Sequence, residues 1–548
     1  MRDFTDERRR REAVLRGHLF RYLDGFPIAP TIHALRRHGV LDLFSGEQTL
    51  GLEEIARRSG GNEGYLQVAL RLLCSQGWLV QAVDARNDRI RYTTTRHTAC
   101  AFAYAGAYAD VVAFLPVAAR MDAYLFEDLE VGAGPDLRVL VERHFGRWGL
   151  EPTGDPDVDV VQKQILLHIE GVLLGPVLVA LGMRGLLARY AIDASAIAAE
   201  DFGADPVRIA PFLDLVEHLG WIEGGRLTEA GRFHFARAAA YGVTVSYLPM
   251  FERVEGLLFG DPRQLWDVEP GGPEIHVDRR MNVWGSGAAH ANYFEKVDQV
   301  VIATFNRPIQ EQPRGIADMG CGNGAFLEHI FDVIWSRTER GKLLDRYPLV
   351  VVGSDLNRAA LEATAETLER ADVWANIVYG DVGDPEALAA HLRETHGIEL
   401  ADLLSVRSFL DHNRLYRPPE LIDAGRESRS SGAFSFRGKR IPNNAIEQNL
   451  VDHLRSWAPH VGRFGLLVLE LHTIPPELAA LNIGRTNVTA YDGTHGYSDQ
   501  YILELDVFLE AASEAGLMPA PEFQAKYPPS DLASISINLL RSAADSPR

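Results

Sequence analysis

The spacing of apolar residues in the first part of the chain predicts a set of three helices followed by a hairpin. Apolar positions recur at helical spacing over residues 34–44, 52–59 and 65–79, and the stretch around 89–93 then alternates between polar and apolar residues. Helical segments followed by a stretch in which every second residue is apolar are typical of a helix-turn-helix with a β-wing. This region therefore predicts a winged-helix unit.

A weaker copy of this pattern follows between residues 180 and 231. Two features repeat in the same order. The first is an Ala-Leu-x-x-x-Gly turn, and the second is a helix that ends in Gly-Trp and an aliphatic residue, at Gly77–Leu79 and again at Gly220–Ile222. The repetition indicates an internal duplication. A segment rich in proline and glycine, 267–273, then predicts a boundary before the second half of the chain.

The first apolar run of the second half leads into a glycine-rich loop. Asp318 is followed by Gly320, Gly322 and Gly324, at every second position, and then by an amphipathic helix. Glycine lets the backbone turn sharply and lets a ligand approach closely, while a helix N-terminus offers unpaired N–H groups. The spacing differs from the G-x-G-x-x-G dinucleotide fingerprint. The loop predicts a nucleotide-binding site.

The next two apolar runs each end in an acidic residue. Asp355, followed by Leu356, is suited to accept hydrogen bonds from ribose hydroxyls, and Asp381, followed by Val382, from an adenine amino group. The three strand ends in this order match the class I S-adenosylmethionine (SAM) methyltransferase pattern, with an NAD-binding Rossmann domain as the alternative. The interval between Gly324 and Asp355 exceeds the usual ~20 residues, which we attribute to an inserted loop at 337–346.

The likeness to class I methyltransferases also implies a role for the helix that precedes the glycine loop. In related enzymes such a helix closes over the methionyl end of the cofactor. His290 and Tyr293 are the candidate contacts, and ordinary packing is the alternative for both.

Polar residues gather after the fourth and fifth predicted strands, where the reacting methyl group is expected because ligands of open α/β sheets bind beyond the carboxyl ends of the strands. The candidate catalytic residues are Asp411, His412, His472 and His495, and Ser408 is a candidate cofactor contact. A His–carboxylate pair among them could act as a general base.

Four motifs make the resemblance more specific. The segments SFLDHNR (408–414), RGKRIPN (437–443), LELHT (469–473) and THGYSDQY (494–501) resemble the C-methyltransferases of modular polyketide assembly lines. They are most similar to the mononuclear iron-dependent type, which methylates a malonyl group on an acyl carrier protein. The resemblance covers roughly residues 280 to 540. It implies a non-haem metal that holds a dicarbonyl, stabilises its enolate and orients the α-carbon toward the sulfonium methyl.

The elementary chemistry agrees with that implication, because a Lewis acid stabilises the enolate that carbon methylation requires. Histidine, carboxylate and amide oxygen suit iron, or manganese, and the motifs carry no cysteine that would favour zinc. The expected ligands are His495 and Gln500 with a further ligand from Asp411 or His412, and His472 is held in reserve.

Charge, hydropathy and cysteine content limit the partners and the cellular location that we expect for this chain. The formal net charge of -20 opposes a nucleic-acid partner, and the recognition-helix positions of the two winged-helix copies carry only one arginine, Arg71. No apolar run approaches the ~20 residues of a membrane span, and the N-terminus lacks the features of an export signal. Three widely spaced cysteines match neither a disulfide framework nor a zinc site, which favours the cytoplasm.

We therefore expect a seven-stranded class I methyltransferase core behind a mostly α-helical lid with two winged-helix-like units. The expected division is a winged-helix-like unit at 1–110, a helical connector at 111–170, a second winged-helix-like unit at 171–280 and the core at 281–548.

The expected substrate is a small-molecule acyl group or one carried in trans by a carrier protein, with no nucleic acid and no membrane, and homodimerisation through the winged-helix units is compatible with this reading. The alternatives are O-methylation by a His–acid base and a non-catalytic SAM-binding regulator.

Overall fold

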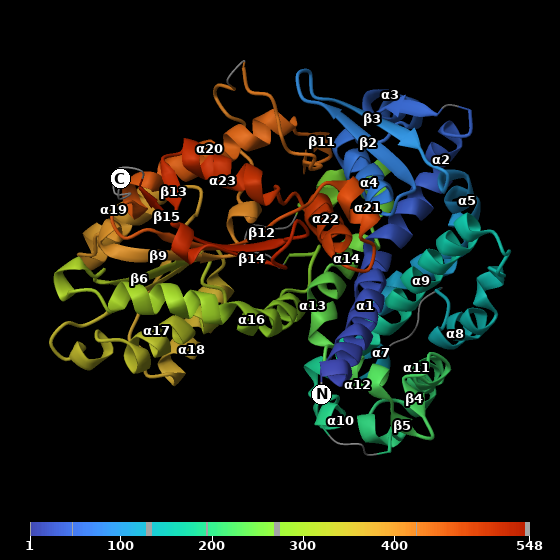
Figure 1. Cartoon of the computed structure of the whole chain (residues 1–548), viewed down its shortest axis with the longest axis horizontal. Helices are drawn as coiled ribbons and strands as arrows, with labels where there is room; N and C mark the ends of the chain where they lie inside the picture. Colours follow the sequence, from blue (N-terminus) through green and yellow to red (C-terminus); the bar gives the residue numbers. More distant parts are fainter. Residues whose placement is uncertain are drawn as a thin grey trace. The chain divides into compact units, whose positions relative to one another are not determined.

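The chain folds as two compact units (Figure 1). The computed structural model describes residues 2–46, 48–127, 134–192, 196–267, 274–422 and 425–542, except for the side chains of 2–6, 191–192 and 288–292. The first unit contains Met1–Ala289, Ala433–Arg440 and Pro475–Asp499, and the second contains His290–Gly432, Ile441–Ile474 and Gln500–Arg548. Two short segments from the C-terminal half therefore fold with the N-terminal unit.

Two long helices, α1 (Arg2–Arg37) and α9 (Pro156–Met183), pack against each other in the first unit. Pro156 begins α9 at a position where its missing N–H costs nothing. Glycines allow the two backbones to touch, since a Cβ added to Gly171 would lie 2.0 Å from the carbonyl oxygen of Tyr22. Among the described residues, α9 and the stretch Thr98–Ala118 are long and apolar enough to cross a membrane, but the apolar window of α9 is 94% buried, as in a core helix.

Replacing Gly171 with alanine should destabilise the first unit by about 1–3 kcal/mol, because the new methyl group must push the two backbones apart. Thermal melting would measure the loss. Gly256 offers the control, since a Cβ there meets nothing within 4 Å. A Gly171→Ala variant that melts together with Gly256→Ala would contradict the close approach.

The first winged-helix unit is built from α3 (Leu52–Ser59), α4 (Glu63–Ser75) and a three-stranded antiparallel sheet in the order β1-β3-β2. Its strands are β1 (Thr49–Gly51), β2 (Leu79–Asp84) and β3 (Arg89–Thr94). The second unit of this kind has α11 (Pro206–His218) and a short wing of β4 (Ile222–Glu223) and β5 (Arg226–Leu227). Both predicted winged-helix units are therefore present, and the second has the weaker wing.

The remaining α-helices and strands of the first unit complete a mostly helical body. They are α2 (Val40–Leu43), α5 (Thr98–Ala103), α6 (Ala109–Ala118), α7 (Met121–Phe126), α8 (Leu137–Phe145), α10 (Ala188–Ile192), α12 (Glu229–Phe235), α13 (Ala239–Ser246), α14 (Leu248–Phe251), α15 (Val254–Phe259), β10 (Ser435–Phe436), β11 (Lys439–Arg440), α21 (Pro476–Leu481) and α22 (Val488–Tyr497).

A buried carboxyl group lies on α1 in this body. Asp24 accepts a hydrogen bond from Gln76, and its Oδ1 atom has no hydrogen-bond partner in the described part of the chain. Burial raises the pKa of Asp24 to about 7. In the unfolded chain this carboxyl ionises near its ordinary pKa, whereas in the folded chain it ionises only near 7. The neutral carboxyl therefore favours the folded state, and this contribution to stability is lost as the pH rises from about 4 through 7.

The Asp24→Asn variant should therefore be more stable than the wild type at pH 8, by about 2–4 kcal/mol, because the amide stays neutral. The difference should shrink as the pH is lowered toward 4. Melting temperatures of both proteins across this range would measure it. A variant that is less stable than the wild type at pH 8 would mean that the ionised carboxylate is tolerated.

The second unit is built around a mixed β-sheet in the order β13-β15-β12-β9-β6-β7-β8, with β14 paired to β15. The neighbours from β12 to β8 are parallel, whereas β15 runs antiparallel to β12. The strand order reverses between β6 and β9, which is where open α/β sheets bind their ligands. This sheet confirms the predicted methyltransferase fold class, with β14 added to the seven expected strands.

The strands of this sheet are β6 (Gly315–Met319), β7 (Val350–Asp355), β8 (Asn376–Tyr379), β9 (Leu403–Ser408), β12 (Leu466–Leu471), β13 (Leu517–Pro519), β14 (Ala525–Tyr527) and β15 (Ile535–Ser542). The helices are α17 (Ala325–Arg337), α18 (Arg358–Arg370), α19 (Pro385–His396), α20 (Asn443–Val461), α23 (Leu505–Glu514) and the part of α16 (Arg279–Phe305) that follows residue 289.

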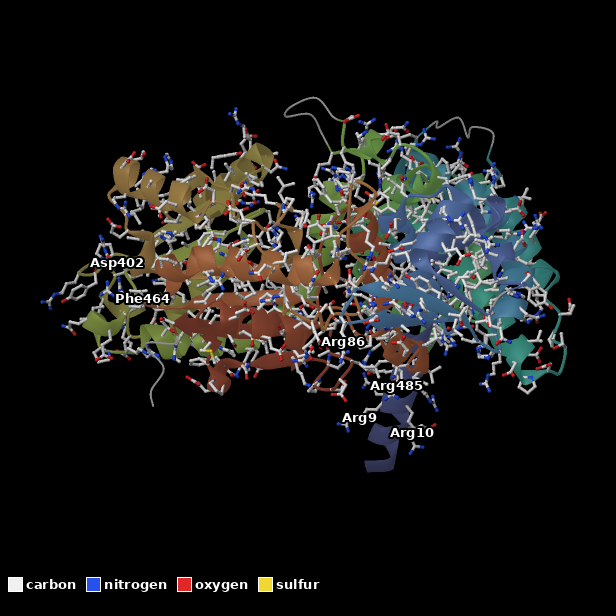
Figure 2. The ribbon with its side chains drawn as sticks, turned by 90° about the horizontal axis from the view of Figure 1, so that it is seen from above. Arg9, Arg10, Arg86, Asp402, Phe464 and Arg485 are labelled. Carbon is white, nitrogen blue, oxygen red and sulfur yellow. The ribbon has the colours of Figure 1, made fainter. Side chains whose placement is uncertain are left out.

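Helices cover both faces of the sheet. Apolar residues of α16, α17 and α18 form one core with the strands, while α20 and α23 pack together on the other face. Asp402 and Phe464 (Figure 2) lie shortly before β9 and β12, at the amino-terminal edge of the sheet. The site lies at the opposite, carboxyl-terminal edge.

Candidate active site

The glycine loop has the backbone geometry that its sequence predicts. Gly320, Gly322 and Gly324 have φ angles of 76°, 57° and 79°, in the left-handed region that favours glycine. A Cβ on Gly320 would lie 2.9 Å from the side chain of Leu410. The loop ends at α17, whose first N–H groups therefore face the carboxyl edge of the sheet.

Asp355 shapes this loop as well as facing the site. Its Oδ2 atom accepts a hydrogen bond from the backbone N–H of Gly322, at 3.2 Å, and its Oδ1 atom accepts one from Asn357, at 2.9 Å. The next residue, Leu356, is 50% exposed. A carboxylate at the edge with an exposed apolar side chain beside it suits a ribose and an adjoining base.

The third acidic residue lies in the loop between β8 and α19. Asp381 accepts a hydrogen bond from the backbone of Gly383, at 2.7 Å, and forms an ion pair with Arg417. The carbonyl oxygen of Val382 accepts a hydrogen bond from Nε1 of Trp457, at 2.7 Å. The loop is thus fixed by partners on both sides.

Two buried polar atoms at the ends of β6 and β9 support a cationic cofactor. Oδ1 of Asp318 and Oγ of Ser408 are buried, and neither has a hydrogen-bond partner in the described part of the chain. Burial, with a smaller effect from the charge of Asp355, raises the pKa of Asp318 well above its usual value. An amino group such as that of SAM would stabilise the ionised carboxylate. The residues of this edge therefore fit SAM.

Tyr293 lies on α16 and its ring packs against two aromatic rings, Phe409 after β9 and Tyr527 on β14. Asp298 joins α16 to α17, through His329 at 2.7 Å and through Arg337. This places Tyr293 beside the loop that follows β9. The side chain of His290 lies outside the described residues.

A buried His–Glu pair stands at the carboxyl ends of β9 and β12, one strand away from the glycine loop. Nδ1 of His412 lies 2.5 Å from Oε1 of Glu470, and the backbone N–H of His412 donates to Oε2 at 3.2 Å. With Nδ1–H donated to the carboxylate, Nε2 is the nitrogen of the ring that can accept a proton. The pair therefore has the composition of a general base.

Asp411 lies among cations. Its Oδ1 atom pairs with Arg407 and accepts a hydrogen bond from Nε2 of His453, at 2.8 Å. Burial acts to raise the pKa of Asp411, but the charge of Arg407 and the hydrogen bond from His453 outweigh it and hold that pKa well below its usual value. Asp411 is therefore an ionised partner of Arg407 and a poor proton acceptor.

His472 is held at both ring nitrogens, by the carbonyl oxygen of Leu503 at 3.2 Å and by Oγ of Ser536 at 2.7 Å. Burial lowers its pKa to about 4. It borders a cavity of about 10 Å³, shared with Asp411 and Glu470, that has room for about one water molecule. The surroundings of His472 give it a structural role.

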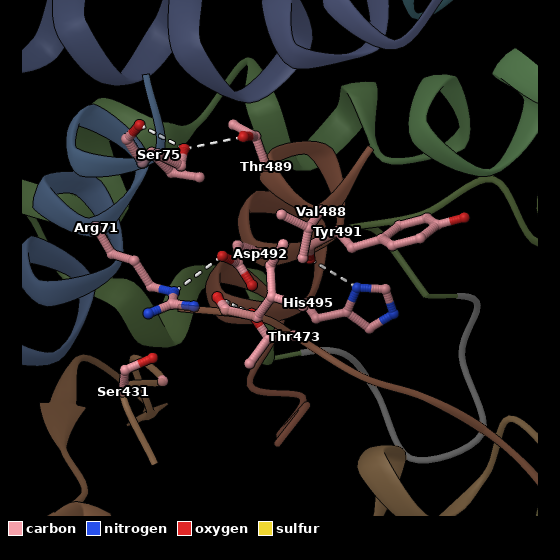
Figure 3. A network of polar contacts seen from close by, with 12 residues as sticks. Arg71, Ser75, Ser431, Thr473, Val488, Thr489, Tyr491, Asp492 and His495 are labelled. Atoms are coloured by element: carbon pink, nitrogen blue, oxygen red, sulfur yellow. Dashed lines mark hydrogen bonds and ion pairs between the residues drawn. The ribbon is translucent and has the colours of Figure 1, made fainter. Parts of the chain in front are cut away.

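The other candidates lie in different units. His495 is on α22 of the first unit, where its Nδ1 atom lies 2.8 Å from the carbonyl oxygen of Tyr491 (Figure 3). The same helix is tied to α4 by the ion pair Arg71–Asp492 and the hydrogen bond Thr489–Ser75. Gln500 belongs to the second unit, and the N–H of the next residue donates to the carbonyl oxygen of His412, at 2.7 Å.

The ligand set that the resemblance implies, which includes Gln500 and has members in both units, stays a prediction. Within the described ranges, no three His, Cys, Asp or Glu side chains are grouped as a metal site. Asp411 also fits poorly as a ligand, because a divalent cation beside it would face the buried charges of Arg407 and Arg414.

Several residues that build this site escaped the sequence analysis. Glu470 could have been found, because it ends a strand beside a polar cluster. Arg407 lies inside the buried strand β9, and His453 and Trp457 come from α20, whose pattern resembles that of any amphipathic helix. No local signal connects these residues to the loop after β9.

Three family matches cover successive parts of the chain. Residues 274–538 match the AprA MT2-like domain, residues 15–81 the AprA N-terminal domain, and residues 170–261 the AprA winged helix domain. The first match contains the glycine loop, both acidic strand ends and the His–Glu pair. Among curated proteins, none matches the chain.

The chain is also similar to solved structures, some of which are methyltransferases. An O-methyltransferase family 2 protein from Planctomyces limnophilus, in complex with apigenin, is 13% identical over 95% of each chain, with a TM-score of 0.35. The complex of LepI with SAM is 10% identical over 79% of this chain and 100% of that chain, with a TM-score of 0.37. DszA carbon methyltransferase is 14% identical over 68% and 88%, with a TM-score of 0.32. TM-scores this low support no argument about this chain, which rests on the motifs at the strand ends and on the family matches.

Proposed function

We propose that this chain, a SAM-dependent methyltransferase, methylates the α-carbon of an acyl or malonyl-like dicarbonyl substrate, with His412 as the base. The buried pair of His412 and Glu470, one strand from the cofactor loop, is the observation that carries the proposal. The motifs shared with polyketide C-methyltransferases supply the substrate class.

The reaction needs a proton acceptor and a poised methyl donor. Nε2 of His412 takes the α-proton, and the carboxylate of Glu470 stabilises the imidazolium that forms. The electron pair of the broken C–H bond then forms the new carbon–carbon bond to the sulfonium methyl. The carbon–sulfur bond breaks, its electrons stay on sulfur, and S-adenosylhomocysteine (SAH) leaves.

We propose in addition that a bound iron or manganese ion assists the carbon methylation. A bound metal would supply Lewis-acid stabilisation of the enolate. Elemental analysis of the purified protein, with activity measured before and after chelation, tests it. Turnover by metal-free protein that chelators do not change would remove the metal from the proposal.

The remaining parts of the proposal concern the cellular setting. The substrate is a free acyl compound or one delivered in trans on a carrier protein, and nucleic acid and membrane take no part. A cytoplasmic location accords with three cysteines that are all free thiols. Homodimerisation through the winged-helix units is open to measurement by light scattering.

The test uses thioesters of malonate and methylmalonate deuterated at the α-carbon, together with a set of phenols, and SAM with a ¹³C-labelled methyl group. Carbon methylation adds the labelled methyl and removes one deuteron from the thioester, which mass spectrometry detects. Labelled methyl found only on phenol oxygen would overturn the proposal in favour of O-methylation. SAH binding without turnover of any substrate would favour a regulator.

A further inference from the structure

We propose that Trp457 and Arg407 connect the cofactor loop at Val382 to His412, and that Asp411 is a positioning residue within this connection. The inference rests on the proposed role of His412 as base. It gives Asp411 a role other than metal ligand or proton acceptor, and it adds a residue of α20 to the machinery of methyl transfer.

The connection begins at the loop that follows β8. Nε1–H of Trp457 donates to the carbonyl oxygen of Val382, at 2.7 Å, so the position of this loop and that of the indole ring are linked. The Cζ atom of Arg407 lies 4.1 Å from the centre of the same ring. A guanidinium stacked on an indole is held by a cation–π interaction and keeps a fixed plane.

Arg407 in turn fixes the position of Asp411, the residue before His412. Its Nη1 atom pairs with Oδ1 of Asp411, and His453 donates to the same oxygen. The side chains of Arg407 and Asp411 are almost completely buried, at 0% and 1% exposure. A buried ion pair of this kind is costly to break, because either charge left alone would be uncompensated.

The neighbouring contacts leave His412 little freedom. Arg414 donates to the carbonyl oxygen of Asp411, at 2.7 Å, and the backbone N–H of Tyr501 donates to the carbonyl oxygen of His412. Asp411 thus fixes the start of the short helix Asp411–Asn413, and Glu470 fixes the ring of His412. The alignment of the ring therefore depends on the ion pair between Arg407 and Asp411.

Another observation separates this arrangement from ordinary packing. Nε and Nη2 of Arg407 have no hydrogen-bond partner in the described part of the chain, although the side chain is completely buried. The guanidinium is therefore held by Asp411 and by the ring of Trp457. Because Arg407 has so few partners, its position depends on Trp457. It therefore also depends on the loop at Val382, which is the predicted adenine contact.

A double-mutant cycle tests the connection. Trp457→Phe keeps a ring beneath Arg407 and removes the donor to Val382, and Asp411→Asn keeps the shape of the side chain and removes its charge. The two single variants and the double variant are compared for the Kd of SAH by calorimetry, for kcat at saturating SAM, and for melting temperature. The matched controls are Trp335→Phe, at an exposed tryptophan of α17, and Asp452→Asn, at an aspartate of α20 whose side chain is 43% exposed.

We expect Trp457→Phe to raise the Kd of SAH about five- to fifteen-fold, and Asp411→Asn to lower kcat about ten- to a hundred-fold. In the Asp411→Asn background, Trp457→Phe should raise the Kd by no more than about two-fold, because the connection is already broken. The controls should stay close to the wild type in all three measurements.

Effects on Kd that simply multiply in the double variant would overturn the inference, as would an Asp411→Asn variant with an unchanged kcat. A variant that loses stability alone, with Kd and kcat intact, would assign these residues to packing and would overturn it too. A different result would show that the proposed function is wrong. In that case His412→Ala would retain activity, whatever the Kd of SAH is in the variants of the cycle.

Discussion

Replacing His412 with alanine should lower kcat by about 10²- to 10⁴-fold, while the Kd of SAH changes by less than about two-fold. The size of the loss follows from removing the proton acceptor of a carbon acid. The unchanged affinity follows because His412 follows β9, whereas the predicted ribose and adenine contacts follow β7 and β8. Steady-state kinetics at saturating SAM, with calorimetry of SAH, measures both values.

Two further variants make this result specific. Glu470→Gln should have an intermediate kcat, since the imidazole remains but the carboxylate that stabilises its protonated form is gone. His391→Ala, at an exposed histidine of α19, is the control and should behave as the wild type. Added imidazole should restore part of the activity of His412→Ala. A His412→Ala variant with wild-type kcat would remove the base from the mechanism.

Replacing Asp355 with alanine should weaken SAH binding by about a hundred-fold. The carboxylate accepts hydrogen bonds from the backbone of Gly322 and Asn357, and it is the predicted partner of the ribose hydroxyls. Losing a charged acceptor of this kind costs about 1.5–3 kcal/mol, and the loosened loop adds to the loss. Calorimetry with SAH gives the affinity without any assumption about the methyl acceptor.

The control for this variant is Asp384→Ala. Asp384 lies between β8 and α19, close in sequence to the predicted adenine contact Asp381, and its side chain caps α19 by accepting a hydrogen bond from Ala387, at 3.1 Å. Its loss should lower stability by about 0.5–2 kcal/mol and leave the affinity for SAH unchanged. If Asp355→Ala binds SAH as well as Asp384→Ala does, the cofactor site lies elsewhere.

The candidate cofactor site could be recognised in the sequence because its signals are local. Asp318 and the three glycines stand within seven consecutive residues, and Asp355 and Asp381 each follow one apolar run. The winged-helix units were predictable for the same reason, since each rests on a pattern within about 60 residues of chain.

The residues of the proposed reaction centre could be predicted only in part. The sequence located the polar strand ends, but it could not tell which neighbour each side chain would meet. Asp411 is an example: a carboxylate next to a histidine suggests a ligand or a base, whereas its pairing with Arg407 and His453 depends on how α20 packs against β9. The sequence order of residues 411 and 453 contains no trace of that contact.

The path of the polypeptide has a practical consequence for dissecting this enzyme. The chain passes from one unit to the other five times, after residues 289, 432, 440, 474 and 499. A fragment cut at 289/290 would carry α21 and α22 away from the helices they pack against, and would leave the N-terminal fragment with an uncovered apolar surface. Deletion, domain exchange and fusion experiments at that single junction should therefore yield aggregating fragments, and coexpressed halves should associate.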